Sequence, residues 1–235
     1  MAKIKYSALV SDMRGKLNGS VASKNRFGSY LRNKVTPVNP QTDAQQNARQ
    51  RFGNISSAFR ALGAAGVTAW NDAAKNFPVN NIFGDQVYLS GQQLFNQLNG
   101  NLLKIGGEIS TAAPEPVSFP NYSIDASGAG VTAGGPAEWS LVISDLAEDP
   151  TGMRLAVYAT RPLPASRSFI KTEYRFLGSF TAPEASEDLD IAARYYSRFG
   201  AIEEGAKVGI RVALVSEATG QQGVPQEVVL VATAP

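Results

Sequence analysis

Hydrophobic positions between residues 44 and 62 recur at helical spacing. They follow one another at intervals of four, four, three, four and three residues: Ala44, Ala48, Phe52, Ile55, Phe59 and Leu62. This spacing predicts a helix with one continuous apolar face. Thr42 is a suitable N-cap, and Gln45 three residues later completes the pattern of a capping box. Gly63 and Gly66 end the predicted helix.

Two further apolar stripes at helical spacing follow in the same region. The first ends at Pro78 and consists of Val67, Trp70, Ala74 and Phe77. The second begins at a Ser90–Gln93 capping box, ends at Gly106-Gly107, and consists of Leu94, Phe95, Leu98, Leu102 and Ile105. Between them "VNNIFGDQVYL" follows neither period and is expected to be irregular. We therefore expect a small helical module at 41–107 whose packing residues include Phe52, Ile55, Phe59, Trp70, Leu94 and Leu98.

The N-terminal 36 residues show short alternating pieces instead of helical stripes. These pieces are "SALVSDM", "GSVAS" and "GSYLRNKV", and Asn18-Gly19 is a common hairpin-turn pair. Pro37 and Pro40 keep the residues before them extended. The apolar residues are too sparse to close a core, so we expect an extended basic arm at 1–40 that needs burial from another source.

After a linker predicted at residues 108–116, the residue pattern becomes typical of β-strands. Six runs rich in Val, Ile, Leu and aromatics are separated by turn signals: "VSFPNYSIDA", "EWSLVISDL", "MRLAVYAT", "EYRFLGSFTA", "KVGIRVALVS" and "QEVVLVATA". Their number and rhythm predict an immunoglobulin-like or fibronectin-like β-sandwich at 117–235, with Trp139 as a core aromatic. "LDIAARYYSRFG" suits either a strand or a crossover helix. The expected fold class is α+β in several parts: arm, helical module and sandwich.

Composition lowers the expectation of catalysis. The 235 residues include no Cys and no His, which removes thiolate nucleophiles, the usual zinc, iron and copper ligands, and the commonest general base near neutral pH. Acidic stretches such as "SDLAEDP", "EASEDLD" and Glu203-Glu204 follow no EF-hand pattern and are interpreted as solvated loop charge. Walker, GxSxG and dinucleotide motifs are absent. We expect no enzyme, no catalytic residue, no cofactor and no metal site.

Charge divides the chain into two contrasting halves. Residues 1–107 hold thirteen Lys and Arg against four Asp and Glu, a net of +9, whereas 108–235 hold nine against sixteen, a net of −7. The cations of the arm and first helix that are expected to contact a partner are Arg14, Lys16, Lys24, Arg26, Arg32, Lys34, Arg49 and Arg51. Interleaved Phe27 and Tyr30 suit stacking on bases, so a phosphate backbone and an acidic protein neighbour are both candidate partners.

One resemblance rests on residues 7–75. The stretch "GKLNGSVASKNRFGSYLRNKVTPVNPQTDAQQNARQRF", followed by "FRALGAAGVTAWNDAA", resembles an uncharacterised family of tailed-bacteriophage and prophage proteins. The matching positions are Gly15, Lys16, Gly19, Arg32, Lys34, Pro37, Asn39, Pro40, Thr42, Gln45, Trp70 and Asn71. The resemblance implies a virion structural protein and supplies no catalytic residues. An Ig-like C-terminal half is similar to decorative domains on phage virions.

These observations together predict a non-enzymatic virion structural protein. Its first expected place is the capsid, as an auxiliary or decoration protein anchored through the arm and helical module. The alternatives are a neck or tail-associated component, a nucleic-acid-binding protein packaged with the genome, and an adhesin whose sandwich binds host glycans. Expected partners are other virion proteins in a homo-oligomeric or multi-copy arrangement, with DNA as the alternative. No window is apolar enough for a membrane span and no targeting signal is evident, so we expect synthesis in the host cytoplasm and no membrane partner.

Overall fold

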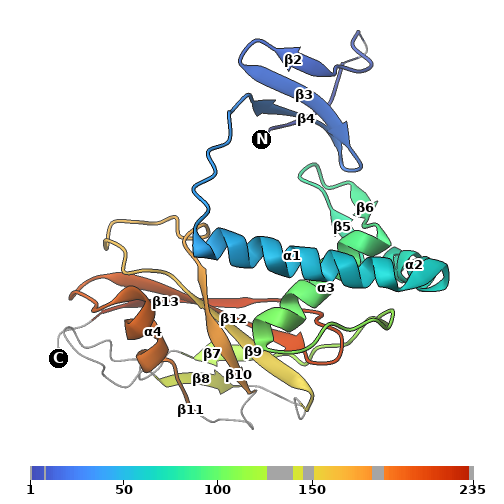
Figure 1. Cartoon of the computed structure of the whole chain (residues 1–235). Helices are drawn as coiled ribbons and strands as arrows, with labels where there is room; N and C mark the ends of the chain where they lie inside the picture. The colour runs from blue at the N-terminus through green and yellow to red at the C-terminus, as the bar shows by residue number, and fades with distance from the viewer. Residues whose placement is uncertain (1, 8, 126–139, 145–150, 182–187, 233–235) are drawn as a thin grey trace. The chain divides into compact units, whose positions relative to one another are not determined.

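The computed structural model combines α-helices with antiparallel β-sheets, an α+β organisation (Figure 1). It describes residues 2–7, 9–125, 140–144, 151–181 and 188–232. The chain divides into two compact units, Met1–Leu94 and Phe95–Pro235. This division falls inside a helix, whereas the sequence placed the boundaries of the helical module at 41–107 and of a linker at 108–116.

The N-terminal residues form a four-stranded antiparallel sheet in the order β1-β4-β3-β2. Its strands are β1 (Ala2–Ile4), β2 (Gly15–Leu17), β3 (Ser20–Asn25) and β4 (Gly28–Asn33). The expected hairpin at Asn18-Gly19 joins β2 to β3, with Asn18 in the left-handed region at φ 49°. "SALVSDM" is not a strand, because the segment folds back on itself: Tyr6 Oη donates to the Met13 carbonyl and Val10 N to the Ser7 carbonyl.

This sheet has almost no core. Among the described residues up to Asn33, only Ala22 and Ser29 are buried. The strands satisfy one another's backbone groups through the ladders β1–β4, β3–β4 and β2–β3. The arm is therefore not an unpaired ribbon, as a bare extended segment would be. What it lacks is buried apolar surface.

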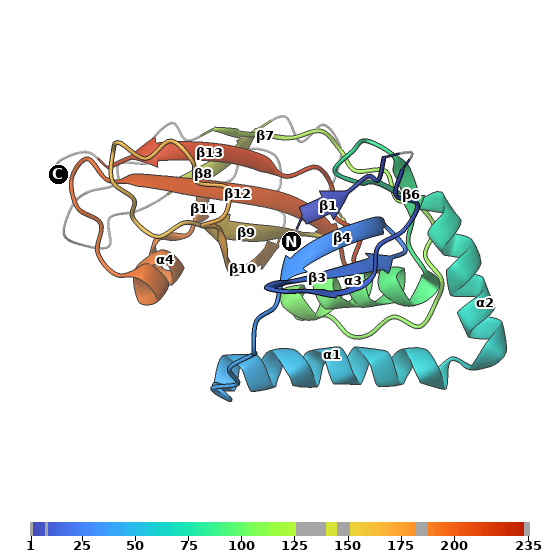
Figure 2. The ribbon, with the colours of Figure 1, turned by 90° about the horizontal axis from the view of Figure 1, so that it is seen from above.

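Three helical segments follow the sheet in the first unit. The segments are α1 (Asp43–Ala61), α2 (Gly63–Ala73) and the short 3₁₀ turn η1 (Ala74–Asn76). Thr42 caps α1 as expected, since its Oγ1 accepts a hydrogen bond from Gln45 N at 3.4 Å. Gly63 adopts φ +70°, which only glycine takes without strain, and α2 leaves the end of α1 at a sharp angle (Figure 2). The first helix therefore ends just before Gly63, as expected, whereas Gly66 lies inside α2.

The predicted apolar face of α1 is buried over only part of its length. Ile55 and Phe59 are buried, and Trp70 of α2 is 1% exposed. Phe52 was expected to pack inside the module, but its side chain is 60% exposed. Ala48 and Ala44, one and two turns earlier on the same face, are exposed as well. The first half of the stripe is thus an uncovered apolar surface, because no described element of this unit covers it.

A hairpin occupies the segment that was expected to be irregular. Its strands are β5 (Pro78–Asn80) and β6 (Gln86–Tyr88). Asn81 shapes the connection, because its Oδ1 accepts from Phe83 N at 2.8 Å and from Asp85 N at 3.0 Å. Asparagine side chains often mimic a backbone turn in this way. Strands of three residues are too short for alternation to reveal them.

The second unit is built on a four-stranded antiparallel sheet in the order β10-β9-β12-β13. The strands are β9 (Met153–Ala159), β10 (Arg175–Thr181), β12 (Lys207–Ser216) and β13 (Gln226–Val231). Helix α3 (Gly91–Ile105) covers one face, where Leu102 and Ile105 pack against Ala156 and Val215. This packing explains why most of α3 belongs to the second unit and not to a separate helical module.

The opposite face of this sheet carries the largest core. It is composed of the alternate positions Leu155 and Val157 of β9 and Ile210 and Val212 of β12, together with residues of α4 (Ala192–Phe199). A three-stranded antiparallel sheet in the order β11-β8-β7 contributes Ile124 to this core. Its strands are β7 (Ser123–Asp125), β8 (Ser140–Ser144) and β11 (Asp188–Asp190).

The strand runs read from the sequence match this unit well. All six contain an observed strand, and the ambiguous "LDIAARYYSRFG" forms the end of β11 and then α4. Two antiparallel sheets contribute to one core, but the helices α3 and α4 lie against the larger sheet, which a simple sandwich does not predict. Trp139, the expected core aromatic, lies outside the described residues.

The expected linker is held in place by buried amides. Asn99 of α3 is fully buried; its Nδ2 donates to the Ser110 carbonyl at 3.2 Å, and its Oδ1 accepts from Ser110 N at 2.7 Å. Gln221 binds the next stretch, accepting from Val117 N at 2.9 Å and donating to the Glu115 carbonyl. The segment at 108–116 is therefore fastened to the second unit through the backbone groups of Ser110 and Glu115, which these two side chains bind.

Replacing Leu102 by alanine tests the docking of α3. Leu102 is 1% exposed, so removing its side chain atoms leaves a cavity and should cost about 2–5 kcal/mol of unfolding free energy. Leu9 is 95% exposed, and Leu9→Ala should change stability by less than about 0.5 kcal/mol. Urea denaturation followed by circular dichroism measures both. Equal effects of the two substitutions would contradict the packing of α3 on the sheet.

Candidate interaction surface

Strand register divides the side chains of the N-terminal sheet between two faces. Residues paired across an antiparallel ladder lie on the same face. Lys3 pairs with Tyr30, while Val21 pairs with both Arg32 and Lys16. Because alternate residues of one strand share a face, these five side chains all lie on one face of the sheet, which we call the basic face.

The other face is formed mainly by small and apolar side chains, with Lys24 opposite Ser29 as its cation. Ala22 pairs with Leu31, which pairs in turn with Ala2. Ile4 lies opposite Ser29 on the same face. Only Ala22 and Ser29 of this set are buried. The sheet thus has a cationic side and a weakly apolar side, and neither side has a substantial core of its own.

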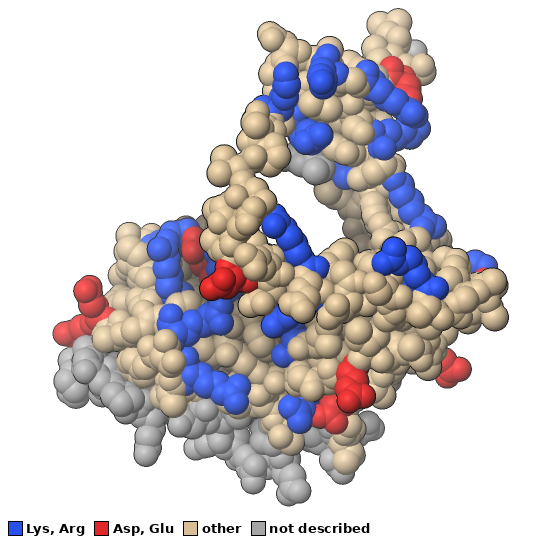
Figure 3. All heavy atoms as spheres, viewed as in Figure 1, with Lys and Arg blue, Asp and Glu red and all other residues tan. Residues whose placement is uncertain are grey.

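Most cations of the arm have no carboxylate partner. Arg14 pairs with Asp12 at 2.9 Å and Lys5 with Asp85 at 3.5 Å. In the part of the chain that the structure describes, no ion pair involves the remaining predicted contact residues of the arm: Lys16, Lys24, Arg26, Arg32 and Lys34. Lys and Arg side chains gather over the N-terminal sheet at the top of Figure 3. Uncompensated charge of one sign is available to an anionic partner.

Aromatic rings lie beside two of the lysines. Lys3 Nζ is 5.8 Å from the Phe27 ring centroid and 5.9 Å from that of Tyr30, and it donates to the Phe27 carbonyl at 3.1 Å. Lys5 Nζ lies 5.0 Å from the Phe83 ring. A hydrogen bond from Asn81 and the nearby Lys5 ammonium lower the pKa of Asp85. These contacts fix two cations locally and leave the others free to meet a partner.

Helix α1 adds an apolar groove with flanking cations. Ala48, Arg49, Phe52, Gly53 and Ser56 line a shallow hollow of about 500 Å³. Arg49 is held beside it by a 2.8 Å hydrogen bond from its Nη2 to Asn39 Oδ1, and Arg51 is exposed. The predicted contact residues on α1 are therefore at the surface, next to an aromatic ring that sequence periodicity had assigned to a core.

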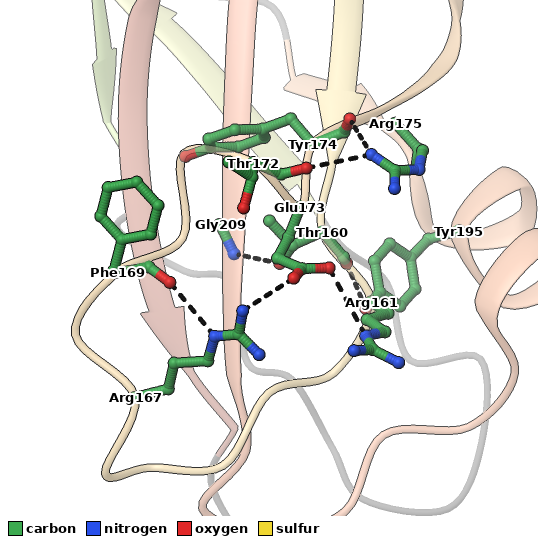
Figure 4. A network of polar contacts seen from close by, with 10 residues as sticks. All are labelled: Thr160, Arg161, Arg167, Phe169, Thr172, Glu173, Tyr174, Arg175, Tyr195 and Gly209. Carbon is green, nitrogen blue, oxygen red and sulfur yellow. Dashed lines mark hydrogen bonds and ion pairs between the residues drawn. The ribbon is translucent and has the colours of Figure 1, made fainter. Parts of the chain in front are cut away.

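The polar network of the second unit is structural in character. Glu173 receives Arg167 Nη2 at 2.7 Å and Arg161 Nε at 3.6 Å (Figure 4). Both of its carboxylate oxygens are engaged, so Glu173 anchors the loop between β9 and β10. At the base of that loop Thr160 Oγ1 accepts from Gly209 N at 2.9 Å, and its carbonyl accepts from Tyr195 Oη at 3.0 Å. Burial raises the pKa of Tyr195, which therefore remains a hydrogen-bond donor.

A hollow of about 630 Å³ lies beside this network. Its walls include Pro162, Leu163, Pro164 and Phe199, and its lining also includes Glu203 and Glu204. Both glutamates are exposed, and neither takes part in an ion pair among the described residues. Apolar walls beside two free carboxylates form a site that suits a cationic segment with an apolar side chain. Sequence analysis treated these glutamates as solvated charge, since their neighbours along the chain gave no sign of the hollow.

Several acidic residues of the other predicted loops lie in parts of the chain that the structure does not describe. Asp145, Glu148, Asp149, Glu184 and Glu187 lie outside the described residues. Within the described ranges no group of three or more acidic side chains is arranged to hold a metal ion, and no helix there is long and apolar enough to cross a membrane.

No protein-family model, no curated protein and no solved structure matches this chain.

Titration of Tyr174 tests the burial of this side chain, which follows Glu173 just before β10 (Figure 4). Burial, strengthened by the Glu227 carboxylate and opposed by Arg211 stacked 4.2 Å from the ring, raises the pKa of Tyr174 to about 12. The folded state then holds this proton more tightly than the unfolded chain, whose pKa is 10.0. The stabilisation is complete below pH 10.0 and disappears as the pH rises towards about 12. The tyrosinate absorbance difference between the wild type and Tyr174→Phe measures it; a midpoint near 10.0 would contradict this burial.

Proposed function

We propose that this chain is a non-enzymatic virion structural protein of a tailed bacteriophage or prophage. We place it in the capsid, as an auxiliary or decoration protein, and keep a position in the neck or tail as the alternative. The N-terminal sheet and α1 attach it to neighbouring subunits. The sequence resemblance of residues 7–75 supplies the viral context, and the exposed surfaces of the first unit supply the physical support.

One observation carries this proposal: the N-terminal sheet buries only Ala22 and Ser29 among its described residues. Ordering about 35 residues costs on the order of tens of kcal/mol in conformational entropy. Backbone hydrogen bonds formed within the sheet offset only part of this, since each contributes about 1 kcal/mol net. A lasting interface of on the order of a thousand Å² or more provides the missing burial.

The uncovered half of α1 supports the same conclusion. Phe52 is 60% exposed, and it lies in an apolar groove beside Arg49. Large aromatics and arginines are the residues that interface centres favour. Exposed apolar residues elsewhere in the first unit, such as Val35 and Val38 between the sheet and α1, extend the surface that a neighbour would cover.

We further propose that the second unit is a decorated β-sandwich of the immunoglobulin-like or fibronectin-like kind. Two antiparallel sheets with Ile124 and Val212 in one core support this proposal. Helices α3 and α4 are then additions to the sandwich. In this arrangement the sandwich is the part that projects from the particle.

Particle incorporation tests the anchoring role. A chain lacking residues 1–36 should remain folded through its second unit but should be lost from purified particles, as quantified by mass spectrometry. Phe52→Ser should reduce incorporation with little change in unfolding free energy, since Phe52 is exposed. The matched control is Phe169→Ser, because Phe169 is 59% exposed but lies in the second unit. Normal incorporation of the truncated chain would refute the anchoring role.

Nucleic-acid binding is the second candidate function, favoured by the basic face. Lys3, Lys16 and Arg32 share that face with the ring of Tyr30. Cations that track a phosphate backbone beside an aromatic that stacks on bases form a common single-strand binding surface. In the virion this surface would meet the packaged genome.

Salt dependence of DNA binding by the full chain distinguishes this candidate. Each phosphate contact should contribute about −0.9 to the log–log slope on duplex DNA, or about −0.7 on single strands. The double variant Lys16→Gln with Arg32→Gln should lose about two phosphate contacts, so its log–log slope should be less steep than that of the wild type by about twice the value per contact. Lys24→Gln with Arg60→Gln removes the same charge from the opposite face of the sheet and from the last turn of α1, and it should reduce the slope less. Absence of binding at low salt would eliminate the candidate.

A further inference from the structure

We infer that the hollow beside Glu203 and Glu204 receives helix α1 of a second copy of this chain, so that copies associate head to tail. This inference rests on the proposed function, because it names the neighbour that covers α1. It specifies a heterologous contact, in which a surface of the first unit of one copy meets a different surface on the second unit of another copy.

Charge is divided between the two units, not spread over the chain. Met1–Leu94 holds twelve Lys and Arg and four Asp and Glu, a net of +8, while Phe95–Pro235 holds ten and sixteen, a net of −6. Two copies therefore attract each other most strongly when the first unit of one faces the second unit of the other. The parallel arrangement, like unit against like, is disfavoured by repulsion.

The hollow and the helix surface match in chemistry as well as in charge. The hollow has the apolar wall residues Pro162, Leu163 and Phe199 and the unpaired carboxylates of Glu203 and Glu204. The α1 surface has the exposed ring of Phe52 in an apolar groove whose lining also includes Arg49. An aromatic side chain entering an apolar hollow while arginines meet carboxylates at its edge is a typical interface centre with a charged rim.

The local structure of the hollow keeps the side chains of Glu203 and Glu204 available for binding. Arg161 on the lining of the hollow is paired with Glu173, a carboxylate that it shares with Arg167, so the two negative charges of Glu203 and Glu204 outnumber the one positive charge that this cluster leaves. Glu203 and Glu204 are held by a turn in which Gly205, at φ 76°, donates its N–H to the Ala232 carbonyl. The hollow therefore presents two free negative charges on a backbone that is fixed by neighbouring strands.

Head-to-tail contacts use different surfaces on the two partners. Such a heterologous interface leaves one free α1 and one free hollow at the ends of every open assembly. Copies therefore add until a ring closes or continue as a filament. A protein present in many copies around a symmetric particle would use this type of contact between adjacent copies.

Sedimentation velocity over a concentration series up to about 1 mM, at low and high salt, tests the inference. The wild type should form dimers and larger species at low salt and dissociate at about 1 M salt, where the screening length falls to about 3 Å. Glu203→Lys with Glu204→Lys should remain monomeric, as should Arg49→Glu with Arg51→Glu. Mixing these two variants should restore association, because each then supplies the charge that the other lacks.

Matched controls separate this contact from general charge effects. Glu108→Lys with Glu115→Lys makes the same charge change on exposed residues away from the hollow, and Lys24→Glu with Arg26→Glu does so away from α1. Both controls should associate like the wild type. Phe52→Ser should weaken association at least tenfold, while Phe169→Ser should not.

Two results would overturn the inference. One is a wild type that stays monomeric at all concentrations and low salt; the other is association that the Glu203 and Glu204 variant leaves unchanged. If the protein is monomeric but Phe52→Ser still fails to enter particles, α1 contacts a different virion protein, and the proposed function survives without this inference. If Phe52→Ser and the truncated chain enter particles normally, the proposed function itself falls.

Discussion

The shortage of buried apolar surface in the N-terminal sheet is the constraint on which the functional argument depends. Hydrogen bonds between strands hold β1 to β4 together, but hydrogen bonds alone contribute little net free energy, because the unfolded chain forms them with water. Burial is the dominant favourable term in folding. A sheet that buries Ala22 and Ser29 alone among its described side chains is stable to the extent that something else covers it.

The second unit shows the opposite balance. Its larger sheet is covered on one face by Leu102 and Ile105 of α3 and on the other by a core that includes Tyr195 of α4. Even the connecting segment is bound, through the buried side chain of Asn99 and through Gln221. This contrast underlies the roles proposed for the two units: the second unit has a core of its own, and the first is proposed to gain burial from a neighbour.

Sequence analysis predicted the second unit more accurately than the first. Runs of β-branched and aromatic residues marked six of its seven described strands, because each run is long enough for its composition to be distinctive. The three-residue strands β5 and β6 were missed. The turn between them is shaped by hydrogen bonds to the side chain of Asn81, and a hydrophobic pattern does not reveal such bonds. Phe52 was placed in a core because periodicity shows which residues share a helix face but not whether that face is covered. The hollow beside Glu203 was invisible for a similar reason: its walls come from segments about 40 residues apart.

The Asn18-Gly19 turn has an importance beyond joining two strands. Because side chains alternate between the faces of a strand, the length of that turn sets which residues of β3 lie beside Lys16. If the turn took in Ser20 as a third residue, Lys16 would pair with Ala22 and would lie on the face opposite to Arg32 and Tyr30. Two residues of turn thus determine the chemical identity of the side that an anionic partner would meet, although neither of them belongs to that side.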